Sequence, residues 1–173
     1  DVVALQQGSR NLNDGTAFVK TAEGALNEIS GILLRLRSIA SQSANGTIDD
    51  VERISTDLEY QASLRELDRI VATTEFNGTF LLDGTLAASQ PAADHNVLQL
   101  GVDSSSNNQF DLNNMLNLTN VGTASLGLSG SNITSQGDAF QALNALTTSI
   151  DDLIQVRGRV GTTQIRIMHA FDN

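Results

Sequence analysis

The sequence predicts a mainly α-helical protein, an elongated bundle of three long helices with coiled-coil-like packing and a small β-hairpin region between the second and third helices. Two observations predict the helices: a seven-residue apolar repeat runs through each end of the chain, and a short turn separates the first repeat from a second apolar stripe. A middle rich in Gly, Asn, Ser and Thr lacks this period. We expect one domain over residues 1–173, comprising helix 1 (1–45), helix 2 (48–72), a hairpin and loop region (73–137) and helix 3 (138–173).

The first helix carries the longest repeat, which consists of two seams. The first seam is Leu5, Leu12, Val19, Leu26, Leu33 and Ala40, and the second is Gly8, Gly15, Ala22, Ile29, Leu36 and Ser43. Small residues at the start of the second seam let a neighbour approach closely, so we expect a second helix close to it there. Asn45 and Gly46 follow the last repeat, a pair typical of a helix C-terminus.

The second and third helices supply the partners that this repeat needs. Thr47 or Asp49 is expected to cap helix 2, and its stripe is Val51, Ile54, Leu58, Leu64, Leu67 and Val71, with one shift in phase. The short turn makes helices 1 and 2 antiparallel neighbours. Helix 3, with Asp138 as its expected cap, has an apolar seam (Leu146, Leu153, Val160, Ile167) and a mixed one (Leu143, Ile150, Arg157, Gln164, Phe171). The predicted core includes Leu26, Ile29, Leu33, Leu58, Leu64, Ile150 and Leu153.

The region between helices 2 and 3 contains short runs that resemble strands. These runs are residues 79–82, 97–102, 109–112 and 124–128, and the turn signals Asn77-Gly78 and Asp83-Gly84 lie among them. Residues 103–108 are expected to form a polar turn. The pattern predicts hairpins and not a large sheet.

Composition excludes several classes of function. The net charge of −10 and the pI near 4.4 argue against a nucleic-acid partner, and no run of apolar residues is long enough to span a membrane. The chain has no Cys, and His95 and His169 are expected at the surface, so we predict no enzyme, no metal and no cofactor. The acidic stretch 103–114 lacks the alternating ligands of a calcium loop. The chain starts at Asp1 without Met, which suggests a piece of a longer protein.

Several dispersed motifs are specific enough to suggest a family. SRNLNDG (9–15), TAEGALNEI (21–29), RLRSIA (35–40) and QSANGT (42–47) are followed by ELDRI (66–70), FNG (76–78) and LQLG (98–101), and the tail has RGRVG (157–161) and QIRIMHAF (164–171). In these motifs and in their order, the chain resembles bacterial flagellin. The resemblance covers about residues 5–101 and 138–173, while the stretch between matches less.

This resemblance implies a structural subunit that self-assembles into the flagellar filament for motility, with other flagellin subunits as its partners. In the family, terminal segments beyond the present ends pair into an inner coiled coil, and the full-length protein has an export chaperone and a cap as partners. Export by the flagellar type III route would place the protein outside the cell. The alternative is the hook-filament junction protein of the same apparatus, which copy number would distinguish. An unrelated helical bundle is the fallback.

The resemblance also implies a binding site for a vertebrate Toll-like receptor that senses flagellin. The family motifs place its recognition residues at Arg35, Ile39 and Glu59, and the same face is expected to contact neighbouring subunits. Arg35 and Ile39 are four residues apart and so share one helix face, beside which antiparallel packing can bring Glu59. The family usually has Leu in place of Ile39 and Glu in place of Ser38; recognition is still expected, at a strength that these two differences can reduce.

Overall fold

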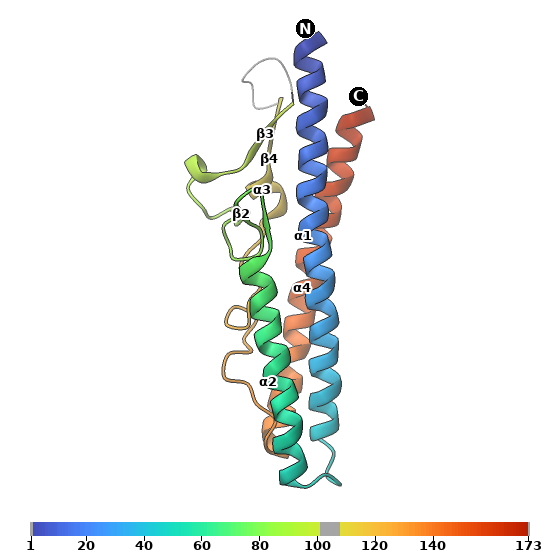
Figure 1. The fold of residues 1–173 in the computed structure, drawn as a ribbon, viewed down its shortest axis with the longest axis vertical. Helices are drawn as coiled ribbons and strands as arrows, with labels where there is room; N and C mark the ends of the chain where they lie inside the picture. Colours follow the sequence, from blue (N-terminus) through green and yellow to red (C-terminus); the bar gives the residue numbers. More distant parts are fainter. Residues whose placement is uncertain (1, 101–107, 173) are drawn as a thin grey trace. The chain divides into compact units, whose positions relative to one another are not determined.

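The computed structural model describes residues 2–100 and 108–172, and these residues divide into two compact units. Among the described residues, unit 1 consists of 2–24, 74–100, 108–120 and 156–172, and unit 2 consists of Ala25–Thr73 and Val121–Gln155. The elements are α1 (Val2–Ser43), α2 (Asp50–Thr73), β1 (Glu75–Phe76), β2 (Thr79–Phe80), the 3₁₀ helix η1 (Ala92–Asp94), β3 (Val97–Gln99), β4 (Gln109–Asp111), α3 (Leu112–Leu116) and α4 (Gln136–Asp172) (Figure 1). The prediction of a mainly α protein with long packed helices and small antiparallel strand pairs is confirmed.

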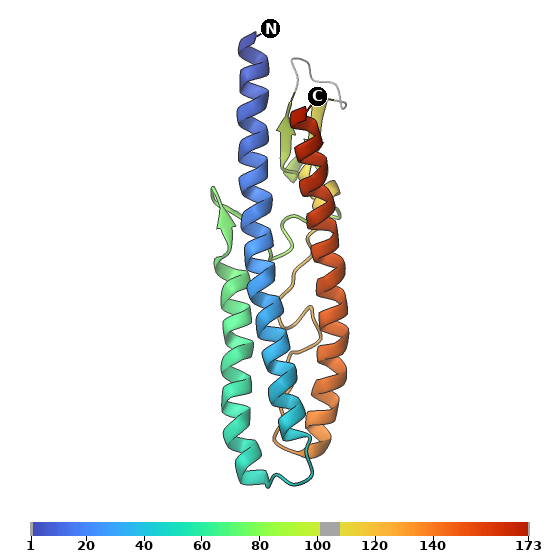
Figure 2. The same ribbon diagram turned by 90° about the vertical axis from the view of Figure 1, so that its right-hand side faces the viewer.

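Both predicted seams of α1 are buried. From Gly8 to Ser43 every residue of the two seams is buried, and Leu26, Ile29, Leu33 and Leu36 have no exposed surface. The side chain of Leu5, the first residue of the repeat, lies outside those described. In unit 2 the segment Ala25–Ser43, α2 and the first part of α4 lie alongside one another in both views (Figures 1 and 2). The seven-residue repeat therefore identifies the face of α1 that forms the core.

The close neighbour at the small residues Gly8 and Gly15 is not a helix, so that expectation is wrong. A Cβ atom at Gly8 would overlap the backbone carbonyl of Leu100, and one at Gly15 would overlap the side chain of Leu98. Leu98 lies in β3, and the backbone N–H of Leu100 bonds to the Asn108 carbonyl just beyond this strand pair. The two glycines thus make room in unit 1 for the strand pair.

The buried face of α2 differs from the predicted stripe. Leu64, Leu67 and Val71 are buried as expected, but Val51, Ile54 and Leu58 are 77%, 55% and 69% exposed. The other buried residues of this helix are Arg53, Tyr60 and Ile70. Arg53, Tyr60 and Leu67 are seven residues apart, so a heptad seam does exist in α2. Arg and Tyr can occupy it because each buries its apolar part while its polar end finds a partner.

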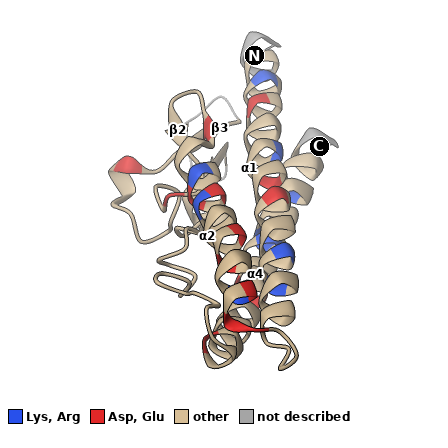
Figure 3. Ribbon diagram, turned by 60° about the horizontal axis from the view of Figure 1, so that its bottom comes forward, with Lys and Arg blue, Asp and Glu red and all other residues tan. Residues whose placement is uncertain are grey.

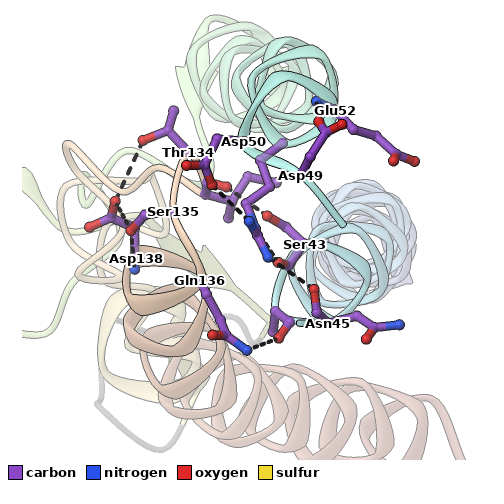
Figure 4. Close-up of polar contacts among 12 residues, drawn as sticks. Ser43, Asn45, Asp49, Asp50, Glu52, Thr134, Ser135, Gln136 and Asp138 are labelled. Carbon is purple, nitrogen blue, oxygen red and sulfur yellow. Dashed lines mark hydrogen bonds and ion pairs between the residues drawn. The ribbon is translucent and has the colours of Figure 1, made fainter. Parts of the chain in front are cut away.

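The buried guanidinium of Arg53 joins the end of α1 to the start of α2. Figure 4 labels three of the residues that it contacts, Ser43, Asn45 and Asp50. Arg53 donates hydrogen bonds to the carbonyls of Ser43 and Asn45 at 2.8 and 2.9 Å, and it forms an ion pair with Asp50 at 2.8 Å. Gly46 is not among the glycines with positive φ, so the expected glycine cap is replaced by this cation, which also suits the negative end of a helix dipole. Asp49 caps α2 by accepting the amide of Glu52 at 2.8 Å.

Helix α4 begins at Gln136, with Ser135 and not Asp138 as its cap. The Ser135 hydroxyl accepts the Asp138 amide at 3.1 Å and donates to the Asp138 carboxylate at 2.6 Å (Figure 4). The Gln136 side chain donates to the carbonyl of Ala44, at the end of α1, at 3.0 Å.

The apolar seam of α4 is buried as predicted, but the second buried seam is not the mixed one that the sequence predicted. The buried residues beside the apolar seam are Ala142, Ser149, Val156 and Thr163, while Leu143, Ile150 and Gln164 are half-buried and Arg157 is exposed; the side chain of Phe171 lies outside those described. Ser149 and Thr163 can be buried because their hydroxyls donate to the carbonyls of Leu126 and Met115 at 2.7 and 3.1 Å.

The middle region contains two antiparallel strand pairs, both in unit 1. β1 and β2 flank the predicted Asn77-Gly78 turn, whose φ angles of 50° and 79° are those of a tight hairpin. The rings of Phe18 and Phe76 meet edge to face, with centroids 5.6 Å apart, and hold this hairpin on α1. β3 pairs with β4 in the register Val97↔Asp111. Residues 101–102 of the predicted strand and 103–107 of the predicted turn lie outside the described residues.

The predicted strand at 124–128 is wrong, because this stretch forms turns. The amide of Leu128 donates to the carbonyl of Thr123 at 2.8 Å, and Gly127 has a φ of 71°. The segment is held by side chains of α2: Asp68 accepts the amide and hydroxyl of Thr123, both at 2.8 Å, and Asp57 accepts the amide of Ile133 at 2.9 Å. Side chains therefore satisfy the backbone groups that a neighbouring strand would otherwise satisfy.

Candidate functional site

The structure brings together two of the three predicted binding residues. Arg35 on α1 and Glu59 on α2 form an ion pair in unit 2, in which Nη2 and Nε of Arg35 lie 2.7 and 3.2 Å from Oε1 of Glu59. Their side chains are 66% and 49% exposed. The pair follows from the antiparallel course of α1 and α2, which places residues 24 positions apart on facing turns. It leaves both charges available to a partner at the surface.

Ile39 lies on the buried side of α1. It is only 6% exposed and precedes Ala40, which belongs to the first buried seam. A spacing of four residues does not place Ile39 beside Arg35 at the surface, because the helix turns by about 40° more than a full turn over four residues. Ile39 therefore packs in the core of unit 2 and has little surface to offer a partner.

Sequence reasoning missed the exposed apolar residues near this ion pair. Leu34 and Leu58 directly precede Arg35 and Glu59 in the chain and are 56% and 69% exposed. Ile54 and Val51 continue one stripe along α2 from Leu58 at spacings of four and three residues. The phase shift in the α2 pattern was the available signal, because it separates this stripe from the buried residues Leu64, Leu67 and Val71.

Charged residues of both signs lie along α2, as Figure 3 shows. Arg37 on α1 and Arg65, Glu66 and Arg69 on α2 are exposed. Glu66 and Arg69 form an ion pair at 2.6 Å along one helix. The hydrogen bond from Arg69 holds the pKa of the Glu66 carboxyl below its usual range. The face thus offers fixed charges and apolar side chains, which suit contact with a protein.

The described residues contain no cluster of metal-binding side chains. In residues 2–100 and 108–172 there is no group of three or more His, Asp and Glu side chains that could hold a metal ion. A hollow of about 440 Å³ in unit 1 is lined by Phe18, Phe76 and Leu98, with Asp14 as its one ionisable group. Over the same residues, every helix is too short or too polar to cross a membrane.

The two histidines differ in their surroundings. His169 is exposed, as the sequence predicts. His95 is not at the surface: its side chain is 6% exposed and forms an ion pair with Asp111, with Nδ1 and Oδ2 2.8 Å apart. The expectation for His95 is therefore wrong, because its polar loop packs against the end of β4.

Comparison with known proteins gives consistent matches. Residues 1–87 match the family described as the bacterial flagellin N-terminal helical region. A flagellin from Halalkalibacterium halodurans is 34% identical over 169 residues, which cover 98% of this chain and 58% of the relative. The flagellar filament 30.7 kDa core protein of Treponema maltophilum is 33% identical over 140 residues, covering 81% of this chain and 46% of the relative.

Solved structures match over most of the chain. The crystal structure of Bacillus cereus flagellin is similar with a TM-score of 0.77 and 30% identity, over 95% of this chain and 88% of that one. A structure of FliC from Burkholderia pseudomallei shares the fold with a TM-score of 0.63 at 15% identity, over 88% and 99% of the two chains. The chain spans about half the length, 58% and 46%, of the first two curated relatives.

Proposed function

Because this chain belongs to the bacterial flagellin family, we propose that it is the core part of a structural subunit of the flagellar filament, which assembles with copies of itself outside the cell and serves motility. The observation that carries this proposal is the match to the B. cereus flagellin fold over 95% of the chain. Flagellins are structural proteins, and we accordingly assign no enzymatic activity to this chain.

The arrangement of the described side chains supports an assembly role. The heptad seams of α1 are already buried within the chain, so they are not the surface that meets another subunit. The exposed groups of unit 2 include the ion pair of Arg35 with Glu59 and the apolar stripe Val51, Ile54 and Leu58. Apolar anchors beside fixed charges are common in interfaces between proteins.

The test is complementation with the full-length protein that contains this chain. Bacteria that lack their own flagellin would express it, and electron microscopy would count filaments while swimming is scored. Long filaments built of this protein are the expected result. A ring of about one turn at the hook would instead identify the hook-filament junction protein, and secretion without any assembly would reject both functions.

We further propose that the exposed charges Arg35 and Glu59 bind the vertebrate Toll-like receptor that senses flagellin, and that they also contact neighbouring subunits. Their exposure and mutual position support direct contact. Ile39, the third residue of the proposed site, is 6% exposed. It would act indirectly, because its packing in the core helps to hold α1 in place. Because one face serves both partners, subunits in a filament would be hidden from the receptor.

Export by the flagellar type III route, with a chaperone before secretion and a cap at the growing tip, completes the proposal. Family membership is its support. The test is secretion of the full-length protein from cells with an intact or a disabled flagellar export gate. The protein should reach the medium only from the first strain, and equal secretion by both would reject the route.

A further inference from the structure

His95 forms hydrogen bonds through both ring nitrogens, and it does so within unit 1. Nδ1 lies 2.8 Å from Oδ2 of Asp111, and Nε2 lies 3.0 Å from the backbone carbonyl of Gln90. The side chain as a whole is 6% exposed. The ring therefore connects Gln90, which precedes η1, with Asp111, the last residue of β4.

Both partners of the ring are hydrogen-bond acceptors. A backbone carbonyl cannot donate a proton, and an ionised carboxylate only accepts. A neutral imidazole has one N–H and one lone pair, so it can satisfy one of these partners and must direct its lone pair at the other. Only the imidazolium ion donates to both. The geometry thus selects the charged form of His95.

The two partners of the ring stand at structural junctions. Gln90 precedes η1, and Asp111 is both the last residue of β4 and the N-cap of α3. Asp111 also accepts the amide of Asn114, at 3.0 Å. Beside the ring, the amide of Leu112 donates to the carbonyl of Asn96 at 2.9 Å.

A second bond holds the same segment. The amide of Asn96 donates to the side-chain oxygen of Asn113, also at 2.9 Å. The segment 90–96 is thus fastened to the junction of β4 and α3 at three adjacent points: the ring itself and the two bonds of Asn96.

We propose that His95 is a pH-sensitive latch: its protonated ring fastens the segment 90–96 to the junction of β4 and α3, and loss of the proton releases that segment. The charged groups that act on the ring are the carboxylates of Asp111, from the β4–α3 junction, and of Asp94, from η1. Both are negative and favour the imidazolium ion. The released segment leads directly into β3, whose Val97 and Leu98 line the hollow in unit 1.

The direction of the pH response follows from the pKa values of the pair. The hydrogen bond to Asp111 raises the pKa of His95 above its ordinary 6.5 despite the opposing effect of burial, and the Gln90 carbonyl and the charges of Asp111 and Asp94 add to the increase. The stabilisation is therefore fully present below pH 6.5 and is lost as the pH rises through the folded-state pKa.

Protonation of Asp111 determines the low pH at which its contact with His95 is lost. Burial alone would raise the pKa of this carboxyl, but hydrogen bonds from His95 and Asn114, with the charge of His95, keep it below its usual range. Its contribution is present above the unfolded pKa and is lost as the pH falls through the lower folded value. The contact between the protonated His95 and the ionised Asp111 is therefore present between the pKa of Asp111 and the pKa of His95. It is lost at alkaline pH, when His95 loses its proton.

The experiment is a nuclear magnetic resonance titration of the 173-residue chain with His169→Gln, which leaves His95 as the single histidine. Nitrogen shifts of the ring report which nitrogens carry protons, and amide exchange reports protection at Asn96 and Leu112. Protection factors are corrected for the intrinsic pH dependence of exchange. The amide of Leu33, in the core of unit 2, is the internal control.

We expect both nitrogens to be protonated up to a pKa above 6.5. Above that pKa, protection at Asn96 and Leu112 should fall about tenfold for each unit by which the pKa is raised, while Leu33 is unaffected. Asp111→Asn, which keeps a capping oxygen for α3 but no charge, should lower the pKa of His95. A ring with one protonated nitrogen at pH 6, or protection at Asn96 and Leu112 that does not change across the titration, would overturn the proposal.

Discussion

Arg53, on α2, donates a hydrogen bond of 2.8 Å to the backbone carbonyl of Ser43, the last residue of α1. A second bond, of 2.9 Å, reaches the carbonyl of Asn45, and the arginine itself is 6% exposed. One side chain thus satisfies carbonyls at the end of one helix from the first turn of the next, and its planar fork allows both bonds at once.

Replacing Arg53 by Lys should destabilise the protein by about 2 kcal/mol, because a buried bond to a charged donor is lost and a carbonyl is left without a partner. Urea unfolding followed by circular dichroism measures the change. Arg65→Lys, at an exposed position of the same helix, is the control and should stay within about 0.5 kcal/mol of the parent. Equal stability of the two variants would mean that the fork geometry of Arg53 contributes nothing.

Leu33 and Leu34 provide a test of the α1 core at adjacent positions. Leu33 has no exposed surface, whereas Leu34 is 56% exposed. Leu33→Ala should lower the free energy of unfolding by about 2–5 kcal/mol, since it leaves a cavity, and Leu34→Ala should change it by less than about 1 kcal/mol. The same unfolding experiment measures both. A loss below about 0.5 kcal/mol for Leu33→Ala would be incompatible with a place in the core.

Removing Arg35 or Glu59 should affect binding far more than folding. Their ion pair is largely exposed, so Arg35→Ala and Glu59→Ala should each cost at most about 1 kcal/mol of stability. Under the proposed function, both variants should lose signalling in cells that carry the flagellin-sensing receptor. Arg157→Ala, at an exposed position of α4, is the matched control. Equal signalling by the parent and both variants would reject the site, and a silent parent would reject the activity.

Asp68 should control protection of the segment that precedes α4. Its carboxylate accepts two hydrogen bonds from Thr123, so Asp68→Ala leaves the Thr123 amide without its partner. Amide exchange at residues 122–128 should accelerate about tenfold or more, while the amides of α1 keep their protection. Asp68→Asn, which retains an acceptor, should have a smaller effect. Unchanged exchange in Asp68→Ala would show that the turns hold themselves together.

The sequence predicted α1 well because each position in its two seams is apolar or small. The same reasoning failed in α2, where Val51, Ile54 and Leu58 resemble a core stripe but are exposed. The buried alternatives, Arg53 and Tyr60, depend on partners from distant segments: the carbonyls of Ser43 and Asn45, and the hydroxyl of Ser131 at 2.8 Å. Local periodicity contains no information about such partners.

The candidate site was predictable to a similar extent. The motif placed Arg35 and Glu59 on helices whose antiparallel packing followed from the short turn, and the structure joins them at 2.7 Å. The burial of Ile39 was not predictable, because this residue lies outside both seams of α1 and is nevertheless buried beside Ala40. The turns at 124–128 were missed because side chains of α2, such as Asp68, and not a strand, satisfy their backbone.

The four glycines of α1 differ in how much space a larger side chain would have. Nothing lies within 4 Å of a Cβ added at Gly24 or Gly31, so Ala at either position should raise the melting temperature, since it favours the helix by up to about 1 kcal/mol. Ala at Gly8 would place a methyl group against the Leu100 carbonyl and should therefore lower the melting temperature. Substitutions that raise the thermal stability are therefore expected at Gly24 and Gly31, in the later half of α1. In the earlier half, Gly8 has no space for a Cβ atom.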